Sequence, residues 1–164
     1  MDNRSLNVYN KFIKIKKEGA MCLCQIPERW KPIGFLILRA GIGSMFIYHG
    51  MGKFLAGPDV LAKVGSALSF LGIHSGHYFF GIMAALSEVG GGACLILGLF
   101  FLPASFFLFF TMCVASTMHL LNGDGLKVAS HAVEAGILFL SLMFIGPGPL
   151  ALDNIIRKHC PCKK

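Results

Sequence analysis

The stretch that decides the fold runs from Tyr78 to Leu121 and reads YFFGIMAALSEVGGGACLILGLFFLPASFFLFFTMCVASTMHLL. Its 44 residues carry one formal charge, the carboxylate of Glu88. As one helix the stretch would be about 66 Å long, whereas the hydrocarbon core of a bilayer is about 30 Å thick. We therefore expect it to cross a membrane twice. Pro103 predicts the break between the two crossings, because proline cannot continue the hydrogen-bond ladder of a helix.

Two further apolar segments, before and after this stretch, predict an all-α membrane four-helix bundle. The last one ends at Gly146-Pro147-Gly148-Pro149, a run that no helix continues through. The predicted spans are residues 33–51, 78–101, 104–121 and 129–145. In the loop at 52–77, Pro58-Asp59 precedes apolar residues spaced three to four apart, which predicts a short amphipathic helix. That helix either lies on the outer membrane interface or forms a lid over a site.

Composition and charge agree with a membrane protein. Hydrophobic residues make up 55% of the chain and charged residues only 14%, against about 25% in soluble domains. The net charge is +7, but a nearly uncharged middle excludes a nucleic-acid-binding face, so the expected partner is the lipid bilayer. Eleven of the fifteen Lys and Arg residues lie in residues 1–31 and 157–164. By the positive-inside rule, both ends are expected in the cytoplasm of a bacterium, with the chain in the inner membrane.

These boundaries divide the chain into three parts. Residues 1–32 are expected to form a basic cytoplasmic segment, 33–153 the membrane domain and 154–164 a basic cytoplasmic tail. Two Cys-x-Cys pairs lie in the terminal parts, at Cys22/Cys24 and Cys160/Cys162. Reduced thiols, one shared zinc ion and lipid acylation all remain open for them.

Ionisable residues inside the spans indicate where a function would reside, because burying them in a membrane is costly. The residues in question are Arg39, His49, Glu88, His119, His131 and Glu134. By position along their spans, four of the six fall in the outer half of the membrane. His131 and Glu134 share a helix face, since they are three residues apart. The pattern predicts that each helix turns its ionisable residue toward a common interior.

Three interpretations of this cluster remain open. In the first, the residues are structural, and Arg39 pairs with Glu88 or Glu134. In the second, they form a redox or proton-handling site for a quinone or a small sulfur species. In the third, the histidines and glutamates bind a metal, although the reversed His-x-x-Glu spacing differs from the Glu-x-x-His motif of di-metal bundles. We assign no metal ligands from the sequence.

Short motifs along the spans resemble those of the DoxX family of four-helix integral membrane proteins. They are Arg39, FIYHGMGK at 46–53, EVGGG at 88–92, Leu97-Gly98, Ala115, His119, Gly123, Glu134, GPG at 146–148 and Leu152-Asp153. Their order and spacing carry the resemblance, which covers about residues 33–153. Ala151 departs from it, since the family often has serine there.

The resemblance implies a four-helix bundle related to the membrane subunit of thiosulfate:quinone oxidoreductase. Other members look like membrane partners of thiol-handling or oxidative-stress proteins. The residues carried over from the family are Arg39, His49, Lys53, Glu88, His119 and Glu134, whereas His131 comes from the cluster alone.

Our functional hypothesis is a membrane component of a redox system, with quinone as the candidate cofactor and a soluble redox or thiol-handling protein as a partner. If the chain is an enzyme, we expect an oxidoreductase subunit. Glu88, His119, Glu134 and His49 are the candidate catalytic residues, and Arg39, Lys53 and His131 the candidate ligand-binding residues. Arg39 and Glu88 are expected to form the inner charge pair. The alternative is a non-enzymatic scaffold for a peripheral enzyme. The sequence leaves homo-oligomerisation open, and a transporter is disfavoured because no broken helix or inverted repeat is visible.

Overall fold

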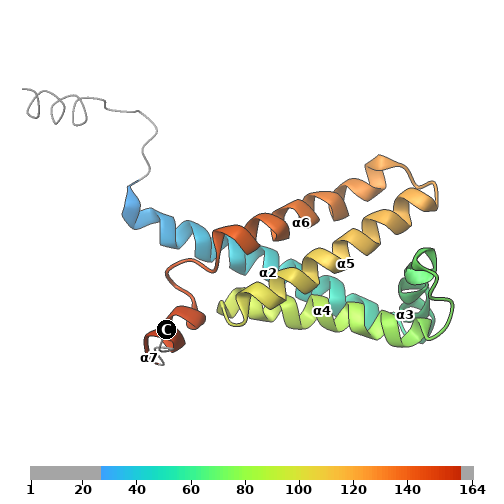
Figure 1. Cartoon of the computed structure of the whole chain (residues 1–164), viewed down its shortest axis with the longest axis horizontal. Helices are drawn as coiled ribbons and strands as arrows, with labels where there is room; N and C mark the ends of the chain where they lie inside the picture. The colour runs from blue at the N-terminus through green and yellow to red at the C-terminus, as the bar shows by residue number, and fades with distance from the viewer. Residues whose placement is uncertain (1–26, 160–164) are drawn as a thin grey trace, which may run out of the picture. The chain divides into compact units, whose positions relative to one another are not determined.

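The computed structural model describes residues 27–159, and in this part every regular element is a helix (Figure 1). Four of the helices within residues 27–159 are long and apolar enough to cross a membrane, which confirms the predicted all-α membrane bundle. They are α2 (Lys31–Leu55), α4 (His77–Leu97), α5 (Phe101–Leu121) and α6 (Leu126–Ile145). The shorter elements are η1 (Glu28–Trp30), α3 (Pro58–Gly65), η2 (Ser66–Leu71) and α7 (Leu152–His159). The predicted Cys-x-Cys pairs lie outside the described residues.

Glycines allow α2 and α4 to pack backbone against backbone. A Cβ atom added to Gly43 would lie 2.6 Å from the carbonyl oxygen of Gly92, and one added to Gly92 would lie equally close to the Gly43 oxygen. Gly50 faces Ala85 and Glu88 in the same way. Small residues in membrane helices permit this close approach. In a lipid environment, where no hydrophobic effect drives helices together, the resulting van der Waals contacts stabilise their association.

Aromatic and aliphatic side chains fill the centre of the bundle. Phe46 of α2 meets Phe139 of α6 edge to face, with ring centroids 4.8 Å apart. Leu108 of α5 is fully buried and fits against Gly91 of α4. These contacts tie α2 to α6 and α4 to α5, while α5 also packs along α6.

The predicted break at Pro103 is wrong, because the chain turns earlier, at residues 98–100. Gly98 adopts a left-handed conformation (φ 65°), and the N–H groups of Gly98 and Leu99 donate to Leu95 and Cys94 in a Schellman cap. Pro103 lies in the first turn of α5, where a missing N–H costs no intrahelical hydrogen bond.

Asp153 of α7 closes the turn between α4 and α5. Its two carboxylate oxygens accept hydrogen bonds from the N–H groups of Phe100 (3.0 Å) and Phe101 (2.9 Å). A carboxylate at a helix N-terminus satisfies orphan donors and complements the helix dipole. The Leu152-Asp153 motif therefore secures the end of the bundle at which α7 lies, here called the α7 end.

At the opposite end, here called the α3 end, the predicted amphipathic helix is present as α3, and it begins at Pro58. It packs tightly on α4, because a Cβ at Gly65 would overlap the carbonyl oxygen of His77 and one at Gly81 would overlap that of Leu61. The following 3-10 helix η2 contacts both α4 and α5. The loop is thus a folded cover over the α4–α5 pair (Figure 1).

Candidate functional site

A cavity of about 510 Å³ lies between this cover and the α4–α5 pair. Its walls are mostly apolar and include Phe80 and Met83 of α4, Phe110 and Val114 of α5, and Leu68 of η2. Pockets of this size and character commonly hold a small organic ligand, with a few polar groups that fix its orientation. The polar groups here are Lys53, Lys63, Ser87, Thr111 and His119.

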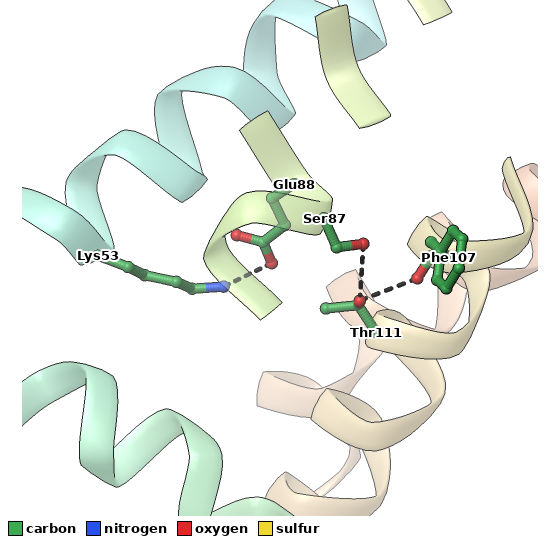
Figure 2. Close-up of polar contacts among 5 residues, drawn as sticks. All are labelled: Lys53, Ser87, Glu88, Phe107 and Thr111. Atoms are coloured by element: carbon green, nitrogen blue, oxygen red, sulfur yellow. Dashed lines mark hydrogen bonds and ion pairs between the residues drawn. The ribbon is translucent and has the colours of Figure 1, made fainter. Parts of the chain in front are cut away.

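A partly buried ion pair borders the cavity at Lys53. The Nζ atom of Lys53, at the end of α2, donates to Oε1 of Glu88 on α4 at 2.5 Å (Figure 2). The Glu88 side chain is only 2% exposed and that of Lys53 is 25% exposed. Lys53 thus neutralises the glutamate and still reaches the cavity wall. The other oxygen, Glu88 Oε2, is buried without a hydrogen-bond partner among the described residues.

Two hydroxyl groups join α4 and α5 beside this pair. Thr111 Oγ1 shares its donor between the Phe107 carbonyl oxygen (2.9 Å) and Ser87 Oγ (3.2 Å). Figure 2 shows Ser87 directed toward Thr111, and Lys53 approaching Glu88 from another helix. Sequence reasoning missed Ser87 and Thr111, because hydroxyl groups in apolar spans often bond only to the preceding turn.

His119 forms a second polar feature of the cavity, at the end of α5. Its Nδ1 lies 2.8 Å from Oδ2 of Asp124 in the loop before α6. Because a carboxylate only accepts hydrogen bonds, this contact places a proton on Nδ1 and leaves Nε2 for another partner. Asp124 was not a candidate from the sequence, although its position five residues after a histidine at a helix end is a usable signal.

Arg39 does not pair with Glu88, so that prediction is wrong. The Arg39 side chain is buried at the α7 end, where Nε donates to Leu95 O (2.8 Å) and Nη2 to Ile96 O (2.8 Å). Nη1 donates to Pro147 O (2.9 Å) and Leu150 O (3.2 Å). Two of these carbonyl groups belong to the last turn of α4, and the other two belong to the segment between α6 and α7. A guanidinium with five donors can satisfy such a set, whereas a carboxylate partner is already taken by Lys53.

The remaining three candidates do not face a common interior as predicted. His49 of α2 and His131 of α6 have ring centroids 5.8 Å apart, but both side chains are exposed. Glu134 is also exposed, on the same face of α6 as His131. The helices are rotated so that Phe139 and Ala135, rather than Glu134, enter the core. The six ionisable residues are thus divided among three places.

The metal interpretation predicted a cluster of histidines and glutamates. Within residues 27–159, no three His, Cys, Asp or Glu side chains are grouped closely enough to hold a metal ion. The polar groups at the cavity are instead the Lys53–Glu88 ion pair, the His119–Asp124 pair and the hydroxyl groups of Ser87 and Thr111. This arrangement can orient a ligand with polar oxygens and exchange protons with it.

Comparison with known proteins agrees with the motifs. The DoxX family model matches residues 34–120, which include α3, α4 and nearly all of α2 and α5. An uncharacterized protein of Haemophilus influenzae is 32% identical over 133 residues, covering 77% of this chain and 93% of the relative. The comparison with solved structures found no match. The match over more than half of the chain, together with this relative, shows that the chain belongs to the DoxX family.

Proposed function

We propose that this protein is the membrane component of a redox system and binds a quinone in the cavity beneath α3 and η2. The observation that supports the proposal best is the cavity itself, whose apolar walls meet the Lys53–Glu88 pair and the hydroxyls of Ser87 and Thr111. A quinone has an apolar ring with polar oxygens at its edge, so it needs this combination of surfaces. When bound, it would supply the capacity to accept electrons and protons.

The residues of the chain would hold the ligand and handle protons. Lys53 has three N–H donors, and its contact with Glu88 uses one of them. Another can therefore donate to a ligand oxygen while the pair stays intact. His119, held by Asp124, presents Nε2 for proton exchange. Apolar residues such as Phe80, Met83 and Phe110 would enclose the ring and exclude water.

The cavity size favours a quinone over a small sulfur anion as the ligand. A volume of about 510 Å³ fits an organic ring with part of a tail, and the walls are mainly apolar. A small anion would instead need several donors converging at one point. A soluble thiol-handling or other redox protein remains our proposed partner, as the source of electrons.

For the location, we propose the inner membrane of a bacterium with both chain ends in the cytoplasm. The basic residues at the two ends support this orientation, since cytoplasmic loops are enriched in Lys and Arg. The cavity then lies near the outer face. Reporter fusions within 66–71 test the orientation, and a cytoplasmic signal there would reverse it.

Quinone binding is tested with a cavity-filling variant and a matched control on the same helix. Ala84 lines the cavity, whereas Leu86 is exposed and does not. We expect the wild type and Leu86→Phe to bind ubiquinone-1 in nanodiscs and to carry quinone after purification in mild detergent. Ala84→Phe should lose both, with its melting temperature retained.

Two results would contradict the proposal. One is a wild type that carries no quinone and does not bind ubiquinone-1 up to its solubility limit. The other is an Ala84→Phe variant that binds as the wild type does. A redox role further requires that thiol-dependent reduction of the quinone pool in proteoliposomes depends on the same site. A protein that binds quinone but never alters this rate is a scaffold instead.

A further inference from the structure

The polar cluster on the α2–α6 face is separate from the cavity and carries a different inference. It consists of His49, His131 and Glu134, all with exposed side chains. The two imidazole rings are 5.8 Å apart and tilted by 55°. No residue of α6 lines the cavity. A role of this cluster is therefore independent of quinone binding in the cavity.

The cluster has no polar partner in the part of the chain that the structure describes. Among residues 27–159, the His49 side chain makes only ring contacts, with Phe46, Tyr48 and His131. Neither the His131 side chain nor the Glu134 side chain forms a hydrogen bond or ion pair with any of residues 27–159. All other glutamates in these residues do form ion pairs, Glu28 with Lys31 and Glu88 with Lys53.

Their depth makes this exposure costly. Glu134 is the ninth residue of α6, about 12 Å from the start of the helix, and His49 is about 9 Å from the end of α2. Both helices cross a hydrocarbon layer about 30 Å thick. A carboxylic acid facing lipid at this depth lacks hydrogen bonds and is among the least favourable groups in a membrane. A protein surface that supplies donors would remove this cost.

A second copy of the chain is the partner that the cluster itself specifies. The cluster contains an acceptor, Glu134, and two groups able to donate, His49 and His131. A patch with both kinds of group is complementary to itself when a two-fold axis relates the copies. If that axis lies along the membrane normal, corresponding residues stay at the same depth, so Glu134 of one copy can meet the histidines of the other.

The surface of α2 beside the cluster permits such an approach. Gly41 and Gly52 are exposed, and a Cβ added at either would meet no atom within 4 Å. Both lie within about 20° of each other around the helix, by its 3.6-residue period. In contrast, the space beside the glycines inside the bundle, such as Gly43, is already occupied by a neighbouring helix. We propose that the α2–α6 face forms a homodimer interface in which Glu134 of each copy pairs with His49 and His131 of the other.

The test uses complementary variants in liposomes, with subunits counted by single-molecule photobleaching at decreasing protein density. Glu134→His leaves only imidazoles in the patch, and His131→Glu leaves an excess of carboxylates. Each variant alone should weaken dimerisation by about tenfold or more, on the scale of two lost polar contacts between membrane helices. Mixed in one membrane, the two should form heterodimers. An intrachain role for these residues cannot be rescued by mixing.

Asp59→Asn, an exposed change on α3, is the matched control and should dimerise as the wild type does. Glu134→Gln is the milder variant, to be used if a stronger change prevents folding, and it should also weaken the dimer. A monomeric wild type at all densities overturns the proposal, as does dimerisation that no variant affects. A mixture that stays monomeric would overturn the Glu–His pairing, and a different protein covering this face would exclude the homodimer.

Discussion

Replacing Arg39 is the sharpest test of how this bundle is closed. The side chain is 1% exposed and donates to four backbone carbonyls at the α7 end, at 2.8–3.2 Å. Leu95 O also accepts from the Gly98 N–H, so it would keep a donor, whereas Ile96, Pro147 and Leu150 have no other turn or loop donor among residues 27–159. Arg39→Met therefore removes four hydrogen bonds and leaves three carbonyls without a donor, in a place that water does not reach easily.

The expected magnitude follows from these contacts. At about 1 kcal/mol net for each hydrogen bond, Arg39→Met should lower the free energy of unfolding by about 4 kcal/mol. On the scale measured for chains of this size, that corresponds to a fall of about 10 °C in melting temperature. Arg39→Lys keeps the charge but has one nitrogen, so it can serve about half of the carbonyls and should lose about half as much.

The assay is thermal unfolding in detergent, followed by the monodisperse fraction on size exclusion. Arg29→Met is the matched control, since it removes an exposed arginine just before α2. Below its melting temperature, Arg39→Lys should still bind ubiquinone-1, because Arg39 does not line the cavity. A melting temperature for Arg39→Met within roughly 2 °C of the wild type would refute this reasoning, because it would correspond to less than about 1 kcal/mol.

Three further predictions concern other contacts. Lys53→Met leaves Glu88 buried without a cation and should lower the free energy of unfolding by about 3–5 kcal/mol, measured by steric trapping. The double variant Lys53→Met with Glu88→Leu should recover most of this loss. A double variant as unstable as Lys53→Met alone would argue against the ion pair. Gly81→Ala places a methyl group against the backbone of α3, so protease digestion of residues 56–72 should accelerate and the affinity for ubiquinone-1 should fall. Gly90→Ala is the control, because a Cβ atom there would meet no other atom, and it should change neither the digestion rate nor the affinity. Asp153→Ala removes the N-terminal cap of α5 and should lower the free energy of unfolding by about 1–2 kcal/mol, whereas Asp153→Asn should lower it less. Equal thermal stability of the wild type and both variants would contradict the capping role.

The bundle was predictable from the sequence because the thickness of a bilayer sets the number of apolar residues that each spanning helix needs. A 44-residue apolar stretch can only cross twice, and the Gly-Pro run after Ile145 can only end a helix. The start of α3 at Pro58 was predictable from local chemistry, because proline is favoured in the first turn of a helix. The turn between α4 and α5 was missed, although Leu97-Gly98 carried the signal of a left-handed cap.

The partners of the ionisable residues were decided by the tertiary structure. Whether Glu88 meets Arg39 or Lys53 depends on helix rotation and on how far a flexible side chain reaches, and neither is encoded in spacing along one helix. The same rotation turns Phe139 inward and leaves Glu134 on the surface. The sequence by itself therefore determined the number of spans, their approximate positions and which residues are costly in a membrane, because those depend on one segment at a time. Only the packing of four helices decided which of these residues are paired, which border the cavity and which lie on the outer surface of the bundle.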